Sequence, residues 1–201
     1  MTTFCIKIMG KVQGVGFRPF VWHLAYEHKL VGEVYNSAEG VFVLVQTTQE
    51  KLISFIAHIG AKAPNISHIE NLEYKEIKTD KIYSDFVISA SEKGKANTSI
   101  SPDLATCEHC QQDIFDPQNR RYLYPFATCM HCGPRYSIVE KIPYDRQNTT
   151  MSVFAMCKHC SGEYSNPSDR RFHAQPNACS ACGPTLFLDK SSHDELSQIE
   201  Q

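Results

Sequence analysis

The chain has 201 residues, of which 42% are hydrophobic, an ordinary fraction for a globular protein of one or two domains. The formal net charge is −2, and basic and acidic residues balance at nine each both in residues 1–90 and in residues 101–190. This balance argues against a polyanion-binding surface. No apolar run reaches the roughly 18 residues of a spanning helix, and the first ten residues are too short and alternating for a signal peptide. We therefore expect a soluble, cytoplasmic protein.

Residues 4–90 alternate patterns that are typical of strands and helices. The SAEG tetrad at 37–40 is a turn signal that joins two strand patterns as a hairpin. The order βαββαβ predicts an α+β, ferredoxin-like sandwich over residues 1–91, with both helices on one face of an antiparallel sheet. The strand patterns are 4–10, 31–36 and 41–47, with one or two closing strands from 72–78 and 85–90, and the helical patterns are 19–30 and 51–63.

Apolar residues at fixed spacing predict the core of this sandwich. Gly60 or Pro64 is expected to end the second helix. The residues expected to face the core are Phe4, Ile6 and Ile8 in the first strand, Phe20, Val21, Leu24 and Ala25 in the first helix, and Leu52, Ile53, Ile56 and Ile59 in the second.

After a polar linker at 92–104 the composition changes, and residues 105–190 are expected to form a second domain before a polar tail at 191–201. Residues 107–134 and 157–184 align without gaps at an offset of fifty, with ten of 28 positions identical, which indicates an internal duplication. The identical pairs are Cys107/Cys157, His109/His159, Cys110/Cys160, Pro117/Pro167, Arg120/Arg170, Arg121/Arg171, Cys129/Cys179, Cys132/Cys182, Gly133/Gly183 and Pro134/Pro184.

Each copy contains two Cys-x-x-Cys turns, and eight of the nine cysteines belong to these turns. A single such turn is compatible with a redox pair, whereas four in a duplicated frame favour zinc, which binds four thiolates tetrahedrally. Closed four-cysteine sites leave no open position, so we expect two structural ions that substitute for a core. Gly133 and Gly183 follow the last cysteine of each copy, where a tight turn can require positive φ. The simplest assignment is Cys107, Cys110, Cys129 and Cys132 for one ion and Cys157, Cys160, Cys179 and Cys182 for the other.

Other interpretations of this region stay open. The two copies could interleave their ligands, and a histidine could replace a cysteine. The Arg-Arg-aromatic runs, residues 120–122 and 170–172, could form a nucleic-acid surface, but pairing of the arginines with Asp113, Asp116 or Asp169 is favoured, and nucleic acid is an unfavoured partner. A zinc deaminase is disfavoured because no cysteine pair directly follows a proline. The candidate histidines are His109, His131, His159 and His173.

The stretch GKVQGVGFRPF, residues 10–20, is a glycine-rich turn at a helix start. Gly14 and Gly16 let successive N–H groups converge on an anion, and Arg18 adds a planar donor fork that matches phosphoryl oxygens. The dinucleotide and P-loop motifs both fail here. The sequence therefore predicts a phosphate-binding loop, with Gln13, Gly14, Val15, Gly16, Phe17 and Arg18 as its members.

Asn36 ends the second strand pattern, in VYNSAEG. A carboxamide offers both a donor and an acceptor, so Asn36 could hold a water in line with a bound phosphorus atom. A plain turn-forming role before Gly40 is the alternative. The residues alone do not separate these two readings.

GKVQGVGFRPFVWHLA together with VYNSAEGVFV resembles the acylphosphatase signature, over residues 1 to about 90. The duplicated four-cysteine unit resembles the N-terminal portion of the HypF family of hydrogenase maturation factors, which are carbamoyltransferases. The resemblance implies that Arg18 and the loop bind a phosphoryl group, that Asn36 orients the attacking water, and that carbamoyl phosphate is hydrolysed to carbamate and phosphate. It further implies that the carbamoyl group later reaches HypE, where it becomes a cyanide ligand of a nickel-iron centre.

Family members continue into adenylating and transfer domains, so we expect a fragment that lacks ATP-dependent transfer, whose fingers orient those further domains. An alternative from another class is a zinc-dependent interaction module whose acylphosphatase-like domain binds an anion without turnover.

Overall fold

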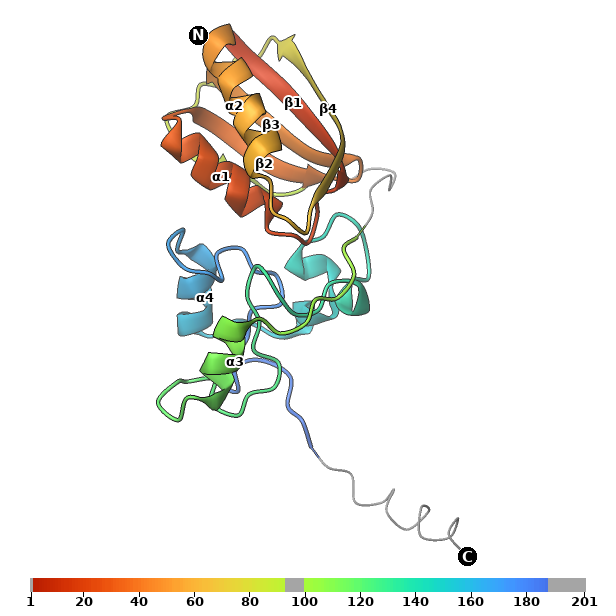
Figure 1. Ribbon diagram of the computed structural model, residues 1–201, viewed down its shortest axis with the longest axis vertical. Helices are drawn as coiled ribbons and strands as arrows, with labels where there is room; N and C mark the ends of the chain where they lie inside the picture. The colour runs from red at the N-terminus through yellow and green to blue at the C-terminus, as the bar shows by residue number, and fades with distance from the viewer. Residues whose placement is uncertain (1, 93–99, 188–201) are drawn as a thin grey trace, which may run out of the picture.

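A computed structural model describes residues 2–92 and 100–187, and the predicted tail at 191–201 lies outside these residues, as does most of the predicted linker. The first part folds as a sandwich of one sheet and two helices, and the second as short helices and loops (Figure 1). The strands and long helices of the first part are β1 (Thr2–Lys11), α1 (Phe17–Glu27), β2 (Val31–Ser37), β3 (Gly40–Thr47), α2 (Gln49–Lys62), β4 (His68–Ile77) and β5 (Phe86–Ile88).

The sheet has the strand order β4-β1-β3-β2-β5, and α1 and α2 both cover one of its faces (Figure 1). The predicted α+β sandwich is thereby confirmed. The two candidate closing segments form separate strands at opposite edges: β4 pairs antiparallel with β1, whereas β5 pairs parallel with β2. The sheet is therefore mixed, and the expectation of a wholly antiparallel sheet was wrong at this one edge.

The core lies between the helices and the covered face of the sheet. Phe4, Ile6 and Ile8 alternate into it from β1, as their period-two spacing predicts. Ile53 was expected there but is 54% exposed, because the buried stripe of α2 runs instead through Leu52, Phe55 and Ile59. The helix begins at an N-cap, Thr48, whose side chain accepts from the N–H of Lys51, and it ends at Lys62, two residues before Pro64.

The second part repeats one small unit around its cysteines. Helices α3 (Glu108–Phe115) and α4 (Lys158–Ser165) each begin directly after the first cysteine of a copy. Between the copies lie three short 3-10 helices, η1 (Tyr136–Ile138), η2 (Arg146–Asn148) and η3 (Thr150–Val153). Within residues 2–92 and 100–187, no helix is long and apolar enough to cross a membrane.

The second part packs against the end of the sandwich from which the β1–α1 loop projects (Figure 1). The indole of Trp22 on α1 lies 5.6 Å from the ring of Phe172, and Gln13 bridges to Ile100. This contact brings residues of the duplicated region onto the glycine-rich loop, which the sequence had not indicated.

Candidate active site and metal centres

The β1–α1 loop turns through two glycines in the left-handed region, Gly14 at φ 73° and Gly16 at φ 71°. Helix α1 starts without a side-chain cap and without an acidic residue in its first turn. The first N–H groups of a helix have no intrahelical acceptor, so those of Phe17 and Arg18 are available to a ligand. The loop therefore has the backbone form of an anion nest at a helix N-terminus.

Arg18 and Asn36 meet at this loop although they come from different elements. The side chain of Arg18 leaves the first turn of α1, and that of Asn36 leaves β2; the residues are only 7% and 2% exposed. Both donate to the backbone carbonyl of Tyr144, from Arg18 Nη2 at 3.3 Å and from Asn36 Nδ2 at 3.2 Å. Within the described residues, Asn36 Oδ1 is buried with no hydrogen-bond partner. A buried, unsatisfied acceptor of this kind is suited to hold a water.

Gln13 has a different part in the loop. Its Nε2 donates to the carbonyls of Ser37 and Gly40, at 2.7 and 3.1 Å, and its Oε1 accepts from the N–H of Tyr144 at 3.0 Å. The side chain is 1% exposed and fully engaged. It ties the loop to the β2–β3 turn and to the second part of the chain, so only its backbone can take part in anion binding.

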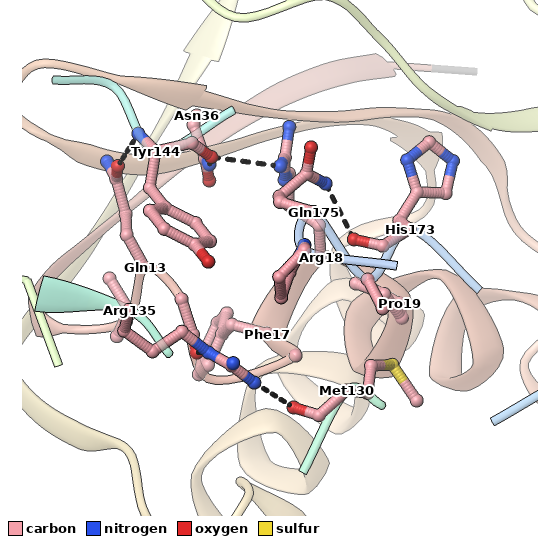
Figure 2. Close-up of a pocket in the computed structure, with 15 residues that line it drawn as sticks. Gln13, Phe17, Arg18, Pro19, Asn36, Met130, Arg135, Tyr144, His173 and Gln175 are labelled. Carbon is pink, nitrogen blue, oxygen red and sulfur yellow. Dashed lines mark hydrogen bonds between the residues drawn. The ribbon is translucent and has the colours of Figure 1, made fainter. Parts of the chain in front are cut away.

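A small cavity, of about 30 Å³, lies between the loop and the duplicated region (Figure 2). A cavity needs roughly 10–15 Å³ to hold one water, so this one has room for at least one water. One wall is made by Gly14, Gly16, Arg18 and Asn36, and the other by Met130, Arg135, Tyr144, His173 and Gln175.

Arg135 is a buried cation beneath the loop, 2% exposed. Its guanidinium donates only to carbonyl oxygens: that of Gly14, and those of Cys129, Met130, Cys132 and Pro134 in its own segment. Within the described residues its side chain has no carboxylate partner at ion-pair distance. Its positive charge favours an anion in the adjoining cavity.

A second, open cavity of about 290 Å³ adjoins the first, and Arg18, His173 and Gln175 border both. There Arg18 Nη2 pairs with Asp145 Oδ1 at 2.7 Å, and Nη1 donates to Ser91 Oγ at 3.4 Å. Burial, and then the positive charge of Arg18, lower the pKa of His173 to about 4, so its imidazole is neutral at pH 7.

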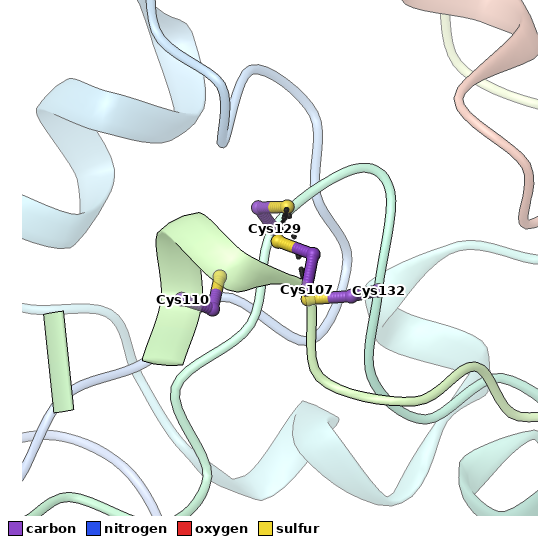
Figure 3. A group of neighbouring side chains, drawn as sticks. All are labelled: Cys107, Cys110, Cys129 and Cys132. Carbon is purple, nitrogen blue, oxygen red and sulfur yellow. Dashed lines mark hydrogen bonds between the residues drawn. The ribbon is translucent and has the colours of Figure 1, made fainter. Parts of the chain in front are cut away.

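The eight paired cysteines gather into two groups of four, with the sulfur atoms of each group within 4.8 Å of one another. Each group takes all four members from one copy, so the interleaved arrangement and the histidine ligands are not what the structure shows. Five sulfur–sulfur pairs within the groups are 3.5 to 3.8 Å apart. A tetrahedron of thiolates about 2.3 Å from zinc has edges of about 3.8 Å, so the groups fit a zinc ion. Figure 3 shows the first group, Cys107, Cys110, Cys129 and Cys132.

Paired arginines from each copy reach across to the cysteine group of the other. Arg120 and Arg121 donate to Cys160 Sγ at 3.3 and 3.7 Å, and both pair with Glu163 at 2.6 Å. Arg170 and Arg171 pair reciprocally with Asp113. Arg170 also donates to Cys110 Sγ, at 2.9 Å. Of the predicted acidic partners only Asp113 was right, because Asp116 and Asp169 instead accept backbone N–H groups within their own turns. The four arginines are thus paired with carboxylates and cysteine sulfurs of the protein itself, which favours a structural role over a nucleic-acid surface.

The two glycines after the cysteine turns have different reasons for being glycine. Gly133 has φ 86°, as expected, whereas Gly183 does not lie in the left-handed region, so that expectation was wrong. A Cβ at Gly183 would lie 2.1 Å from the hydroxyl of Tyr124 and 2.6 Å from Ala178 Cβ. Close packing, not backbone conformation, excludes a side chain there.

Comparison with known proteins agrees with this two-part architecture. The Acylphosphatase family model matches residues 4–88, and the HypF finger model matches residues 106–139 and 156–188. A Carbamoyltransferase HypF from Synechocystis sp. is 47% identical over 154 residues, which are 77% of this chain and 20% of that protein. The chain belongs to the HypF family.

Two further matches define the extent of the likeness. A crystal structure of full-length HypF in the phosphate- and nucleotide-bound form superposes with a TM-score of 0.84 at 42% identity, over 99% of this chain and 27% of that one. An acylphosphatase from Staphylococcus haemolyticus is 30% identical over 81 residues, 40% of this chain and 91% of that protein. The chain therefore spans between a fifth and about a quarter of the length of these HypF relatives and nearly the whole of a free-standing acylphosphatase.

The sequence did not indicate the residues of the second part that border the site, among them Arg135, Tyr144, Asp145, His173 and Gln175. Three of these five lie in or just after an aligned copy, at positions where the copies differ: Leu123 stands opposite His173, Pro125 opposite Gln175 and Thr185 opposite Arg135. This divergence was an available signal. Tyr144 and Asp145 fall between the copies, where the alignment offers none.

Proposed function

We propose that this chain binds an acyl phosphate at the Gln13–Arg18 loop and hydrolyses it, with carbamoyl phosphate as the substrate. Arg18 and the loop N–H groups bind the phosphoryl group, and Asn36 holds the attacking water. The observation that carries this proposal is the convergence of Arg18 and Asn36, buried, at one cavity beside the loop, with Asn36 Oδ1 unsatisfied among the described residues.

The reaction needs positioning and charge more than a strong base. Asn36 Oδ1 accepts a hydrogen bond from the water, and the oxygen of the water attacks phosphorus. The phosphorus–oxygen bond to the acyl group breaks, carbamate leaves, and the proton of the water passes to a phosphate oxygen. Carbamate is a good leaving group, so oriented donors and cations supply most of the rate enhancement. Arg18 contacts the phosphoryl oxygens, and Arg135 adds its charge from beneath the loop.

Substrate binding requires a change of partners at Arg18. Its guanidinium is held by Asp145 and the Tyr144 carbonyl. The incoming dianion therefore exchanges with these acceptors.

We further propose that each four-cysteine group holds one structural zinc ion, with Arg120, Arg121, Arg170 and Arg171 partly neutralising the thiolates. A metal-replete preparation is expected to contain two zinc ions per chain by atomic emission. One ion or none would contradict this assignment. Reduced thiolates of this kind are compatible with a cytoplasmic location.

In the longer HypF protein, the carbamate formed here would supply the carbamoyl group that is passed to HypE. The Synechocystis relative is named a carbamoyltransferase, and this chain corresponds to a fifth of it, so the transfer belongs to the whole protein.

The test is phosphate release from carbamoyl and acetyl phosphate. Release is expected to fall to background in Arg18→Ala and on the order of 100-fold in Asn36→Ala. Lys62→Ala, which removes an exposed cation on α2, should leave both rates unchanged. Equal rates in wild type and Arg18→Ala would refute the assignment. Binding of inorganic phosphate without turnover would instead support the alternative, an anion-binding interaction module.

A further inference from the structure

The fingers place two hydrogen-bond acceptors beside the site, the carbonyl oxygen of Tyr144 and the carboxylate of Asp145. Both are satisfied by the groups that the proposed mechanism assigns to the substrate. The Tyr144 carbonyl accepts from Arg18 and Asn36, and Asp145 pairs with Arg18. When Arg18 turns to a phosphoryl group, Asp145 loses its donor and the Tyr144 carbonyl loses one of its two, because Asn36 holds the water through Oδ1 and keeps its bond from Nδ2 to Tyr144.

The position of these acceptors indicates which end of the substrate they meet. The first cavity is bordered by the loop and by Tyr144, and Asp145 borders the second, open cavity; both acceptors contact the same nitrogen, Arg18 Nη2. A phosphoryl group on the loop amides therefore leaves its acyl group directed toward the Tyr144–Asp145 segment. The acyl group is the part of the substrate that can replace the lost donors.

Carbamoyl and acetyl groups have nearly the same shape and differ mainly in the substituent on the carbonyl carbon. The amino group of a carbamoyl group carries two N–H donors, whereas the methyl of an acetyl group carries none. The side chain of Asp145 is 14% exposed and Tyr144 is 3% exposed, so water has little access to either acceptor. An acceptor left unpaired in such a place costs free energy that appears as a lower kcat/KM, roughly 10- to 100-fold.

We propose, building on the function above, that the Tyr144 carbonyl and the Asp145 carboxylate are the specificity-determining groups of this site. They accept the two hydrogens of the carbamoyl amino group and so favour carbamoyl phosphate over acetyl phosphate. The selectivity comes from the fingers and not from the acylphosphatase domain, whose Arg18 and Asn36 act on the phosphoryl group common to both substrates.

The experiment compares kcat/KM for carbamoyl phosphate and acetyl phosphate in wild type, Asp145→Ala and Asp145→Asn. Wild type is expected to favour carbamoyl phosphate by about 10-fold or more. In Asp145→Ala this ratio should fall by about 10-fold, because the carbamoyl value drops more than the acetyl value. Asp145→Asn keeps one acceptor and the side-chain shape, so its ratio should lie between the two. Glu140→Ala, which removes an exposed carboxylate nearby, should keep the wild-type ratio.

A role of Asp145 in merely positioning Arg18 would lower both values equally, and an unchanged ratio would overturn the proposal. So would a wild-type ratio near one. If Asp145→Ala loses its metal or its fold, the ratio of the two kcat/KM values in Asp145→Asn provides the test.

Absence of turnover with either substrate would remove the proposed hydrolysis but would still leave selectivity measurable. Calorimetric titration then compares the affinities for phosphonoacetamide and acetonylphosphonate, a stable pair that differs in the same amino and methyl groups. Tighter binding of the amide by wild type, lost in Asp145→Ala and reduced in Asp145→Asn, supports the assignment; equal affinities in wild type overturn it.

Discussion

Glu163 offers the sharpest test of how the two fingers stabilise each other. Its carboxylate accepts from Arg121 Nη1 at 2.9 Å and from Arg121 Nη2 at 2.6 Å, and it pairs with Arg120 at 2.6 Å. Burial acts to raise the pKa of Glu163, but hydrogen bonds from Arg121 and Arg120 and the charges of the arginines outweigh it and lower the pKa to about 2. Because the folded pKa is depressed, the stabilisation is complete above the ordinary pKa of 4.5 and is lost as the pH falls toward 2.

The shift from 4.5 to about 2 corresponds to about 3 kcal/mol of stability at pH 7. Glu163→Gln removes the charge but keeps the shape, and it leaves Arg121, 2% exposed, without its carboxylate partner. Breaking one partner of a buried pair costs about 3–5 kcal/mol, which agrees with that magnitude. We therefore expect the free energy of unfolding of Glu163→Gln to fall by about 3 kcal/mol.

Urea unfolding of the metal-replete chain measures this, followed by circular dichroism and by fluorescence of Trp22, the single tryptophan, which contacts Phe172 of the second finger. Glu140→Gln, at an exposed carboxylate, should change the free energy of unfolding by less than about 0.5 kcal/mol. A loss below about 1 kcal/mol in Glu163→Gln would refute the reasoning. Paired residues do not contribute additively, so Arg121→Met should lower the free energy of unfolding by less in Glu163→Gln than in wild type. An equal loss in the two backgrounds would also refute the reasoning.

Three further predictions follow from other contacts. Arg135→Met should weaken inorganic phosphate binding by on the order of 10-fold in calorimetry, because it removes a buried cation beside the cavity; an unchanged affinity would contradict this. Because the pKa of His173 is lowered to about 4, its imidazole stays neutral in the folded protein between pH 6.5 and 4 but is charged in the unfolded chain, so wild type loses stability over this range. His173→Asn should lose less, since asparagine does not titrate and tolerates the positive φ of 53°. Equal pH profiles in urea unfolding would exclude that cause. Gly183→Ala should destabilise the fold by about 1–3 kcal/mol through the clash with Tyr124, whereas the open position Gly162→Ala should not; similar unfolding midpoints would be inconsistent with the close packing.

The sandwich was accessible from the sequence because its elements carry regular patterns. Phe4, Ile6 and Ile8 alternate into the core, and the SAEG tetrad lies between β2 and β3, as predicted. The error at Ile53 reflects a helix with apolar residues on more than one side, for which spacing alone does not choose the buried stripe. The short strand β5 has three residues, too few for any pattern to reveal its parallel pairing.

The candidate site was accessible only in part. The sequence indicated the loop, Arg18 and Asn36, because a glycine-rich turn and a polar strand end are local features. It did not indicate Tyr144 or Asp145, because their role depends on how the second part of the chain docks on the first. That docking uses scattered contacts, such as Gln13 with Tyr144 and Arg135 with Gly14, which follow no spacing in either segment.

The duplication explains why the fingers can both fold as a pair and serve one site. The positions that the copies share, the cysteines and the Arg-Arg pairs, form the metal groups and the reciprocal contacts between them. The positions at which they differ include His173 and Gln175, which face the cavity from the second copy only. The two copies meet the loop region with different residues, Met130 from the first and His173 and Gln175 from the second, so these positions are free to diverge while those that hold the units together are not. The shared residues thus hold the unshared ones beside Arg18. A change in the metal groups is therefore expected to alter the binding of the acyl phosphate.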